Sequence, residues 1–238
     1  MSPSRICAAL LCALATSSPL WSQDEDVSLH VTIAHDHDRT RHQPSTSRNI
    51  VVWLNPVQPQ PQPLEPRPAQ QYTLVQKDKQ FTPHVLVVPT GSSVDFPNMD
   101  PFFHNVFSLF NGKRFDLGLY EAHTHHTVHF DREGISYIFC NIHPQMGAVI
   151  LSLSTPYYGT SLADGSILIH DVPPGSYQLT LWAEDVTRER LAAAARVVEI
   201  KPGHEQLATI VLQGSGDMMA QHTNKFGEPY QQPTKDPY

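Results

Sequence analysis

Residues 134–153 read GISYIFCNIHPQMGAVILSL and contain two apolar runs on either side of a short polar loop. The runs ISYIF and GAVILSL are rich in β-branched and aromatic residues, which favour strands. Between them, Cys140, His143 and Met146 follow one another with two residues between each pair, and Pro144 stiffens the turn. The stretch therefore predicts two strands joined by a tight loop, with a thiolate, an imidazole and a thioether pointing inward.

These three side chains form a soft ligand set, which favours copper over magnesium, calcium or manganese. A trigonal site with two histidines, one cysteine and a weak axial methionine needs one more histidine. His104 stands at the start of a strand-like run in NMDPFFHNVFS, where a β-sandwich could bring it beside the loop. A structural zinc site would use more cysteine or histidine and would not recruit Met146. We expect one copper ion bound by His104, Cys140, His143 and Met146.

Short strand-like runs with turn signals between them continue in both directions from this loop and predict an all-β fold. One group of runs fills residues 71–154, and a second group lies between residues 165 and 212. LAAAA at 191–195 predicts a helical turn. The first group consists of YTLVQ, HVLVVP, SSVDFP, HNVFSLF, TVHF, ISYIFC and GAVILSL, and the second of GSILIHDV, GSYQLTLWAE, ARVVEI and LATIVL.

Two further runs near the N-terminus, VSLHVTI (27–33) and NIVVWL (49–54), predict a pair of strands. An isolated pair is only marginally stable, so it needs other strands to cover it. We therefore expect 27–54 and 155–213 to build one domain, with 71–154 inserted. The alternative is two sequential domains. Residues 55–70 form a Pro/Gln-rich linker, and 214–238 are expected to be a disordered tail.

The first 22 residues resemble a secretory signal peptide, with an apolar ICAALLCALA core followed by small and polar residues. The apolar run is too short to span a bilayer, although an uncleaved anchor is an alternative. Cleavage would remove Cys7 and Cys12 and leave Cys140 as the single thiol of an exported chain. Because free thiols tend to be oxidised outside the cytoplasm, metal ligation would explain Cys140. We expect a periplasmic or secreted protein without a membrane span in the mature chain.

The net charge is −7 and no run of lysine or arginine occurs, which argues against nucleic acid as a partner. Histidines gather in two polar stretches, where they either bind a second metal ion or are simply solvated. The stretches hold His35, His37 and His42, and His123, His125, His126 and His129.

The segment from 71 to 154 resembles the cupredoxin family, in particular its plastocyanin and amicyanin branch. The resemblance rests on His104 followed by Asn105, on the CxxHxxM spacing and on VLVVPTGSSVDFPNMD before the first ligand. The layout also resembles bacterial plastocyanin-like proteins of the methylamine-utilisation type. The resemblance implies an eight-stranded Greek-key sandwich with one type 1 (blue) copper ion near one end. It further implies that Asn105 supports the ligands and that His143 lies nearest the surface.

An apolar patch around His143 would suit transient docking of redox partner proteins. Candidates for this patch are Met99, Pro101, Phe102, Phe103 and Pro144, although Phe102 and Phe103 are equally compatible with a core position.

ADGSILIHDVPPGSYQLTLWAE (163–184) resembles a second family, the carboxypeptidase regulatory-like, transthyretin-type β-sandwich. VSLHVTI and NIVVWL look like the opening hairpin of that fold. The resemblance implies a structural or adhesive module without chemistry of its own, and leaves open a role in binding partner proteins or glycans. The predicted fold is thus a Greek-key cupredoxin sandwich inserted in, or adjacent to, a second, smaller β-sandwich.

The function expected from the ligand set is electron transfer by a protein that is not an enzyme. A copper carrier or storage protein would use the same ligands and exchange the metal, with the His-rich stretches as loading sites. A structural module with a vestigial site would bind copper weakly or not at all. Copper oxidases and nitrite reductases fit less well, because they usually join several cupredoxin domains and need an additional all-histidine copper centre.

Overall fold

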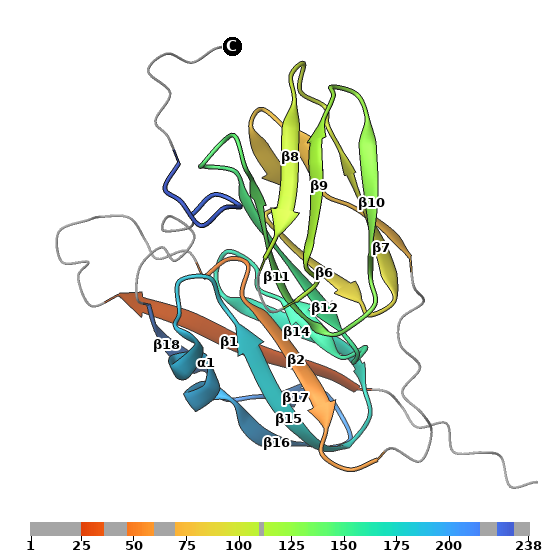
Figure 1. Ribbon diagram of the computed structural model, residues 1–238. Helices are drawn as coiled ribbons and strands as arrows, with labels where there is room; N and C mark the ends of the chain where they lie inside the picture. The colour runs from red at the N-terminus through yellow and green to blue at the C-terminus, as the bar shows by residue number, and fades with distance from the viewer. Residues whose placement is uncertain (1–24, 36–46, 60–69, 110–111, 215–222, 231–238) are drawn as a thin grey trace, which may run out of the picture.

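The structure, a computed structural model, describes residues 25–35, 47–59, 70–109, 112–214 and 223–230 (Figure 1). The predicted signal peptide, most of the Pro/Gln-rich linker, His37 and His42 lie outside these residues. Within them the chain forms strands and a single short helix, which confirms the predicted all-β fold class. No helix in this part of the chain has the length and apolar character needed to cross a membrane.

The ligand loop belongs to a group of ten strands that occupies the upper half of Figure 1. A three-stranded sheet, β10-β7-β3, faces a five-stranded sheet, β6-β12-β11-β8-β9, and β4 and β5 form a hairpin beside them. Phe96 and Phe130 from the first sheet meet Ile138 and Ile150 from the second in one buried cluster. The strands are β3 (Gln71–Thr73), β4 (Val75–Lys77), β5 (Gln80–Thr82), β6 (Val85–Pro89), β7 (Ser92–Pro97), β8 (His104–Ser108), β9 (Phe115–Tyr120), β10 (His125–Phe130), β11 (Gly134–Cys140) and β12 (Gly147–Leu153).

The remaining strands form two more sheets, in the lower half of Figure 1. In one of them β1 lies between β14 and β17 and also pairs with β18, and the other has the order β13-β2-β15-β16. Their apolar side chains meet in a second buried cluster. The elements are β1 (Glu25–His35), β2 (Val51–Pro56), β13 (Tyr158–Thr160), β14 (Ser166–Val172), β15 (Gly175–Trp182), α1 (Arg188–Ala194), β16 (Arg196–Ile200), β17 (Glu205–Gln206) and β18 (Ile210–Gly214).

The predicted pairing of the first two strands is wrong, because β1 and β2 lie in different sheets. The reason is visible in the burial of β2, whose residues Val51–Leu54 are all buried. Val52 and Leu54 face the cluster shared with β1, whereas Val51 and Trp53 face a third cluster. A strand covered on both faces belongs inside a layered structure. β2 therefore shares a core with β1 from a different sheet, and its hydrogen-bonded neighbours within its own sheet are β13 and β15.

Each ladder within the described residues joins two strands of the same group. We propose that the two groups are separate domains, one formed by 71–154 and the other by 27–54 together with 155–213. An apolar interface connects them, in which Trp53 and Trp182 pack with Val149, Leu151 and Leu153 of β12. Since the alternate residues Ala148 and Ile150 point into the other core, β12 is apolar on both faces from Ala148 to Leu151.

Candidate metal centre

Two adjacent strands bring the first histidine to the ligand loop. His104 is the first residue of β8 and Cys140 the last of β11, and these strands pair with Cys140 opposite Val106. Two backbone hydrogen bonds close the loop itself. The Cys140 amide donates to the Met146 carbonyl at 3.2 Å, and the Met146 amide donates to the His143 carbonyl at 3.0 Å.

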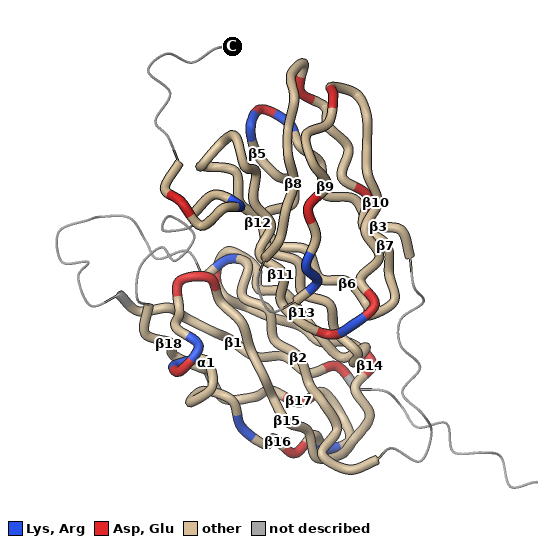
Figure 2. Tube along the Cα trace, in the orientation of Figure 1, with Lys and Arg blue, Asp and Glu red and all other residues tan. Residues whose placement is uncertain are grey.

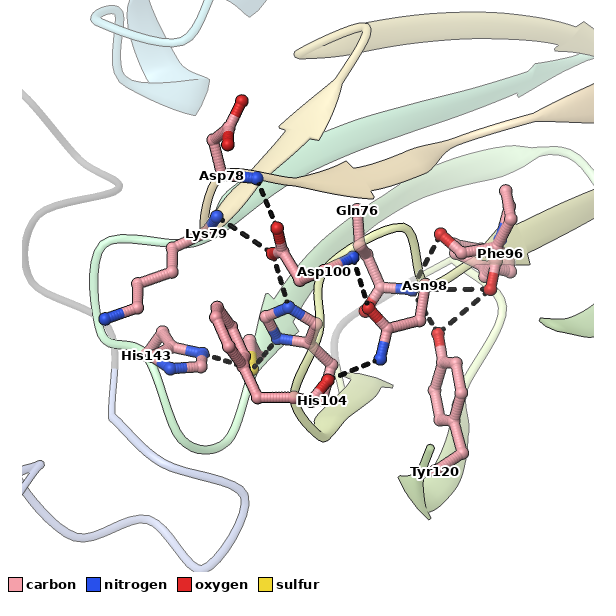
Figure 3. Close-up of polar contacts among 12 residues, drawn as sticks. Gln76, Asp78, Lys79, Phe96, Asn98, Asp100, His104, Tyr120 and His143 are labelled. Atoms are coloured by element: carbon pink, nitrogen blue, oxygen red, sulfur yellow. Dashed lines mark hydrogen bonds and ion pairs between the residues drawn. The ribbon is translucent and has the colours of Figure 1, made fainter. Parts of the chain in front are cut away.

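The structure brings three of the four predicted ligands together. Cys140 Sγ lies 3.7 Å from Nδ1 of His104 and 3.7 Å from Nδ1 of His143. All three side chains are buried, and their candidate ligand atoms lie within 4.8 Å of one another. Both imidazole rings approach the sulfur in Figure 3. Met146 ends the loop and is fully buried in the same cluster as Cys140, and its role as the fourth ligand stays a prediction.

A buried carboxylate that the sequence did not reveal orients His104. Asp100 is 3% exposed, and its Oδ2 lies 2.8 Å from Nε2 of His104. The amides of Asp78 and Lys79 donate to Asp100 at 2.6 and 3.0 Å (Figure 3). These two residues form the turn between β4 and β5 with positive φ angles of 54° and 56°. Because this backbone conformation is costly for residues other than glycine, the hydrogen bonds to Asp100 help to stabilise the turn.

The protonation states at the site favour metal binding through Nδ1 of His104. Burial lowers the pKa of His104 and outweighs the opposite effect of Asp100, so the imidazole is neutral at pH 7. Burial acts to raise the pKa of Asp100, but the hydrogen bonds from Lys79, His104 and Asp78 lower it overall. A neutral His104 donates its Nε2 proton to the Asp100 carboxylate, which leaves the Nδ1 lone pair directed at the site.

Cys140 is held as a thiol before any metal binds. Burial raises its pKa, although the amides of Asn105, Ile142 and His143 act in the opposite direction. A cysteine sulfur and two imidazole nitrogens, all buried and close together, are donors that a soft transition metal prefers, so the residues present fit copper.

Asn105 supports the site through its neighbours. Its carbonyl accepts a hydrogen bond from the Asn141 amide at 3.3 Å, and its side-chain amide donates to Asp116 and to the Gly118 carbonyl, both at 2.7 Å. The first contact connects β8, which begins at His104, to the residue after Cys140, and the other two connect it to β9.

His143 is 8% exposed and lies beside the ring of Phe102. The Phe102 ring lies 5.3 Å from the ring centroid of His104 and 5.6 Å from that of His143. Phe102 is half-buried, and Met99 and Phe103 are 51% and 43% exposed. Phe102 and Phe103 thus belong to the surface around the site rather than to the core, and Ile142, 41% exposed, extends this surface.

The second histidine stretch is exposed on and beside β10. Within the described residues, His104, Cys140 and His143 are the one group of three or more His, Cys, Asp or Glu side chains arranged to hold a metal ion. A second metal site at His123, His125, His126 and His129 therefore has no preformed geometry in this part of the chain.

No protein-family model and no curated protein matches the chain. Among solved structures, it is similar to a purple cupredoxin from Nitrosopumilus maritimus, with 21% identity over 34% of this chain and 99% of that one, at a TM-score of 0.32. A Cu-containing nitrite reductase from Thermus scotoductus SA-01 gives 25% identity over 42% of this chain and 25% of that one, at 0.33. A reduced Cu(I) amicyanin variant gives 16% identity over 35% and 82%, also at 0.33.

Proposed function

We propose that this protein binds one copper ion through His104, Cys140, His143 and Met146 and carries single electrons between redox partners. The observation that carries the proposal is the approach of a buried thiol to two imidazole nitrogens, each 3.7 Å from the sulfur. Copper in such a ligand set supplies a one-electron couple. The predicted signal peptide supports an exported, periplasmic or secreted location, where metal ligation would account for the single thiol of the mature chain.

The way the ligands are held suits electron transfer better than metal exchange. Strand pairing fixes His104 and Cys140, and backbone hydrogen bonds fix the loop that carries His143 and Met146. Asp100 fixes the orientation of the His104 ring by accepting a hydrogen bond from its Nε2. Ligands constrained in this way change position little when the oxidation state changes. The proposed electron transfer makes and breaks no substrate bond, so we assign the protein no catalytic residue.

Partner docking is proposed at the surface formed by Met99, Phe102, Phe103 and Ile142. Phe102 lies beside the imidazole of His143, with ring centroids 5.6 Å apart, and the other three side chains are exposed and apolar, as weak and short-lived redox encounters require. Figure 2 shows Lys and Arg interspersed with Asp and Glu along the described trace, so a shape-based apolar contact accounts for docking better than a single charged face.

The function is tested by cycling the copper-loaded protein between oxidation states. We expect repeated reduction by ascorbate and reoxidation by ferricyanide to leave the copper content, measured after gel filtration, unchanged. A copper carrier would instead lose metal to a competing chelator during the reduced phase. A structural module with a vestigial site would retain no copper after the first gel filtration, and either result would contradict the proposal.

Replacement of Asp100 by asparagine should weaken the site through His104. The Asp100→Asn variant loses the negative charge behind the imidazole, so copper affinity should fall by roughly 10–100-fold, the usual effect of losing such a support. Loss of this charge also destabilises the more positive ion, so the reduction potential should rise. Competition with a chelator and a redox titration measure the two effects. The matched control is Asp131→Asn, an exposed carboxylate paired with Lys113, which should change neither quantity.

A further inference from the structure

The chain returns to the metal centre near its C-terminus. Residues 223–230, here named the C-terminal strap, belong to the stretch expected to be a disordered tail, but they form a small folded loop. The Asn224 side-chain oxygen accepts hydrogen bonds from the amides of Phe226 and Glu228 at 2.9 and 3.0 Å. The Asn224 amide donates to the Glu228 carbonyl at 2.9 Å, and Gly227 provides the positive φ that this turn needs.

Three contacts attach the C-terminal strap to the ligand loop and to β9. The Tyr230 hydroxyl donates to the backbone carbonyl of Cys140 at 2.9 Å. The Lys225 amide donates to Oδ1 of Asn141 at 3.0 Å, and its ammonium group lies 2.8 Å from Oδ2 of Asp116. The strap thus contacts a proposed ligand, the residue that follows it, and a carboxylate on β9.

Asp116 extends this attachment to the other side of the site. Its Oδ1 accepts the hydrogen bond from Asn105, the residue after His104. Burial acts to raise the pKa of Asp116, but the hydrogen bonds from Lys225 and Asn105 lower it overall, so the carboxylate stays charged and can hold both donors. The strap, Asp116 and Asn105 therefore connect the strand that carries His104 with the loop that carries Cys140.

The C-terminal strap contributes little to the hydrophobic cores. None of its residues belongs to the buried clusters formed by the described part of the chain, and Phe226 is 71% exposed. Its polar contacts are instead concentrated on residues 116, 140 and 141. A segment with this distribution of contacts acts on the ligand loop more than on the stability of the fold.

We propose that Lys225 and Tyr230 are positioning residues that hold the ligand loop closed over Cys140 and thereby slow the release of the metal. The proposal rests on the proposed function, because it concerns the same copper ion. For the metal to leave, Cys140 or His143 must move away from His104, and this movement breaks the hydrogen bonds that the strap makes to the loop. This role of the strap suits an electron carrier, which keeps its metal, better than a protein that delivers copper.

The test compares the full-length protein with Tyr230→Phe and with the double variant Lys225→Ala, Tyr230→Phe. Copper release is followed as transfer of Cu(I) to an excess of a coloured Cu(I) chelator. The double variant loses the Tyr230 hydroxyl bond to Cys140 and the ion pair between Lys225 and Asp116, but keeps the bond from the Lys225 amide to Asn141. We expect it to release copper about 3–10-fold faster, the range given by losing one or two net hydrogen bonds. Tyr230→Phe alone should show a smaller increase. Combining Tyr230→Phe with Lys225→Arg, which keeps the charge, instead of with Lys225→Ala should restore the part of the retention that the ion pair with Asp116 provides.

A second measurement requires no copper. In the metal-free protein, the rate at which an aromatic disulfide reagent modifies the buried Cys140 thiol reports how often the loop opens. We expect this rate to rise several-fold in the double variant, with an unchanged circular dichroism spectrum. Glu228→Gln is the matched control, since the side chain is exposed on the same segment and should leave both rates as they are.

The two measurements, copper release and thiol modification, distinguish a failure of this inference from a failure of the proposed function. Equal copper release and equal thiol modification in all variants would overturn the role of the strap while leaving the copper site in place. An unmodified protein that binds no copper would overturn the proposed function, and the effect on metal retention with it. In that case, thiol modification would still show whether the strap closes the loop.

Discussion

The Cys140→Ser variant, loaded with Cu(II), is expected to lack the intense visible absorption band of the unmodified protein. That band arises from charge transfer between a thiolate sulfur and Cu(II), and Cys140 Sγ is the sulfur that lies between the two imidazoles. Serine has nearly the same size, so the buried position should tolerate it, but its hydroxyl is a hard and weakly acidic ligand. Visible absorption and electron paramagnetic resonance spectra of both proteins measure the loss.

Controls make this result specific to the thiolate. Circular dichroism should show that Cys140→Ser keeps the fold, and residual Cu(II) bound by the histidines should give an ordinary, nearly colourless spectrum. Because burial raises the pKa of the Cys140 thiol, the metal must displace a proton, so copper affinity should fall as the pH is lowered. A colourless unmodified protein, or a spectrum that the substitution leaves unchanged, would sink the electron-transfer proposal and favour metal storage or a structural role.

Replacement of Trp182 by alanine should produce the largest loss of stability. Trp182 is 2% exposed and lies in the interface cluster with Trp53, Val149 and Leu151. Its indole N–H also donates to the Tyr137 hydroxyl at 3.3 Å. Trp182→Ala removes this buried area and leaves a cavity, so the free energy of unfolding should fall by about 3–5 kcal/mol. Denaturant unfolding followed by far-ultraviolet circular dichroism measures the change.

An exposed residue of a neighbouring strand provides the comparison. Val197 lies on β16 and is 61% exposed, so Val197→Ala should change the free energy of unfolding by no more than about 0.5 kcal/mol. If Trp182→Ala cost as little as Val197→Ala, the interface cluster would not be packed in solution as described. A retained copper spectrum in Trp182→Ala would indicate that the interface affects stability without distorting the ligand loop.

The sequence was informative where a function depends on neighbours along the chain. Cys140, His143 and Met146 share one loop, so their spacing alone indicated a soft metal site. The choice of His104 required only that two strands lie side by side, as the pairing of β8 with β11 shows. Mainly apolar runs such as that of β12 also predicted strands correctly, because a strand buried on both faces carries few polar residues.

Contacts between distant segments were not predictable in the same way. Asp100 stands four residues before His104, but its partners Asp78 and Lys79 come from another hairpin. The strand pairing of β1 and β2 was misjudged, because nearness in sequence suggested a hairpin where two layers exist. The polar composition of 223–230 predicted disorder. That prediction missed the hydrogen bonds that attach this segment to the ligand loop, because their partners lie 84 or more residues away along the chain.

The strand order also affects how the chain folds during synthesis. β1 and β2 are made before the ten strands of the ligand-bearing sandwich, whereas the strands that pair with them, β13, β14, β15, β17 and β18, are made after it. The strands of that sandwich pair with one another, so it can fold while the edges of β1 and β2 still lack hydrogen-bonding partners. Such edges are prone to aggregation, so the nascent chain is most vulnerable before residues 158–214, which contain the partner strands, have been made. Export in an unfolded state, or a chaperone that covers these two apolar strands, would protect it during that interval.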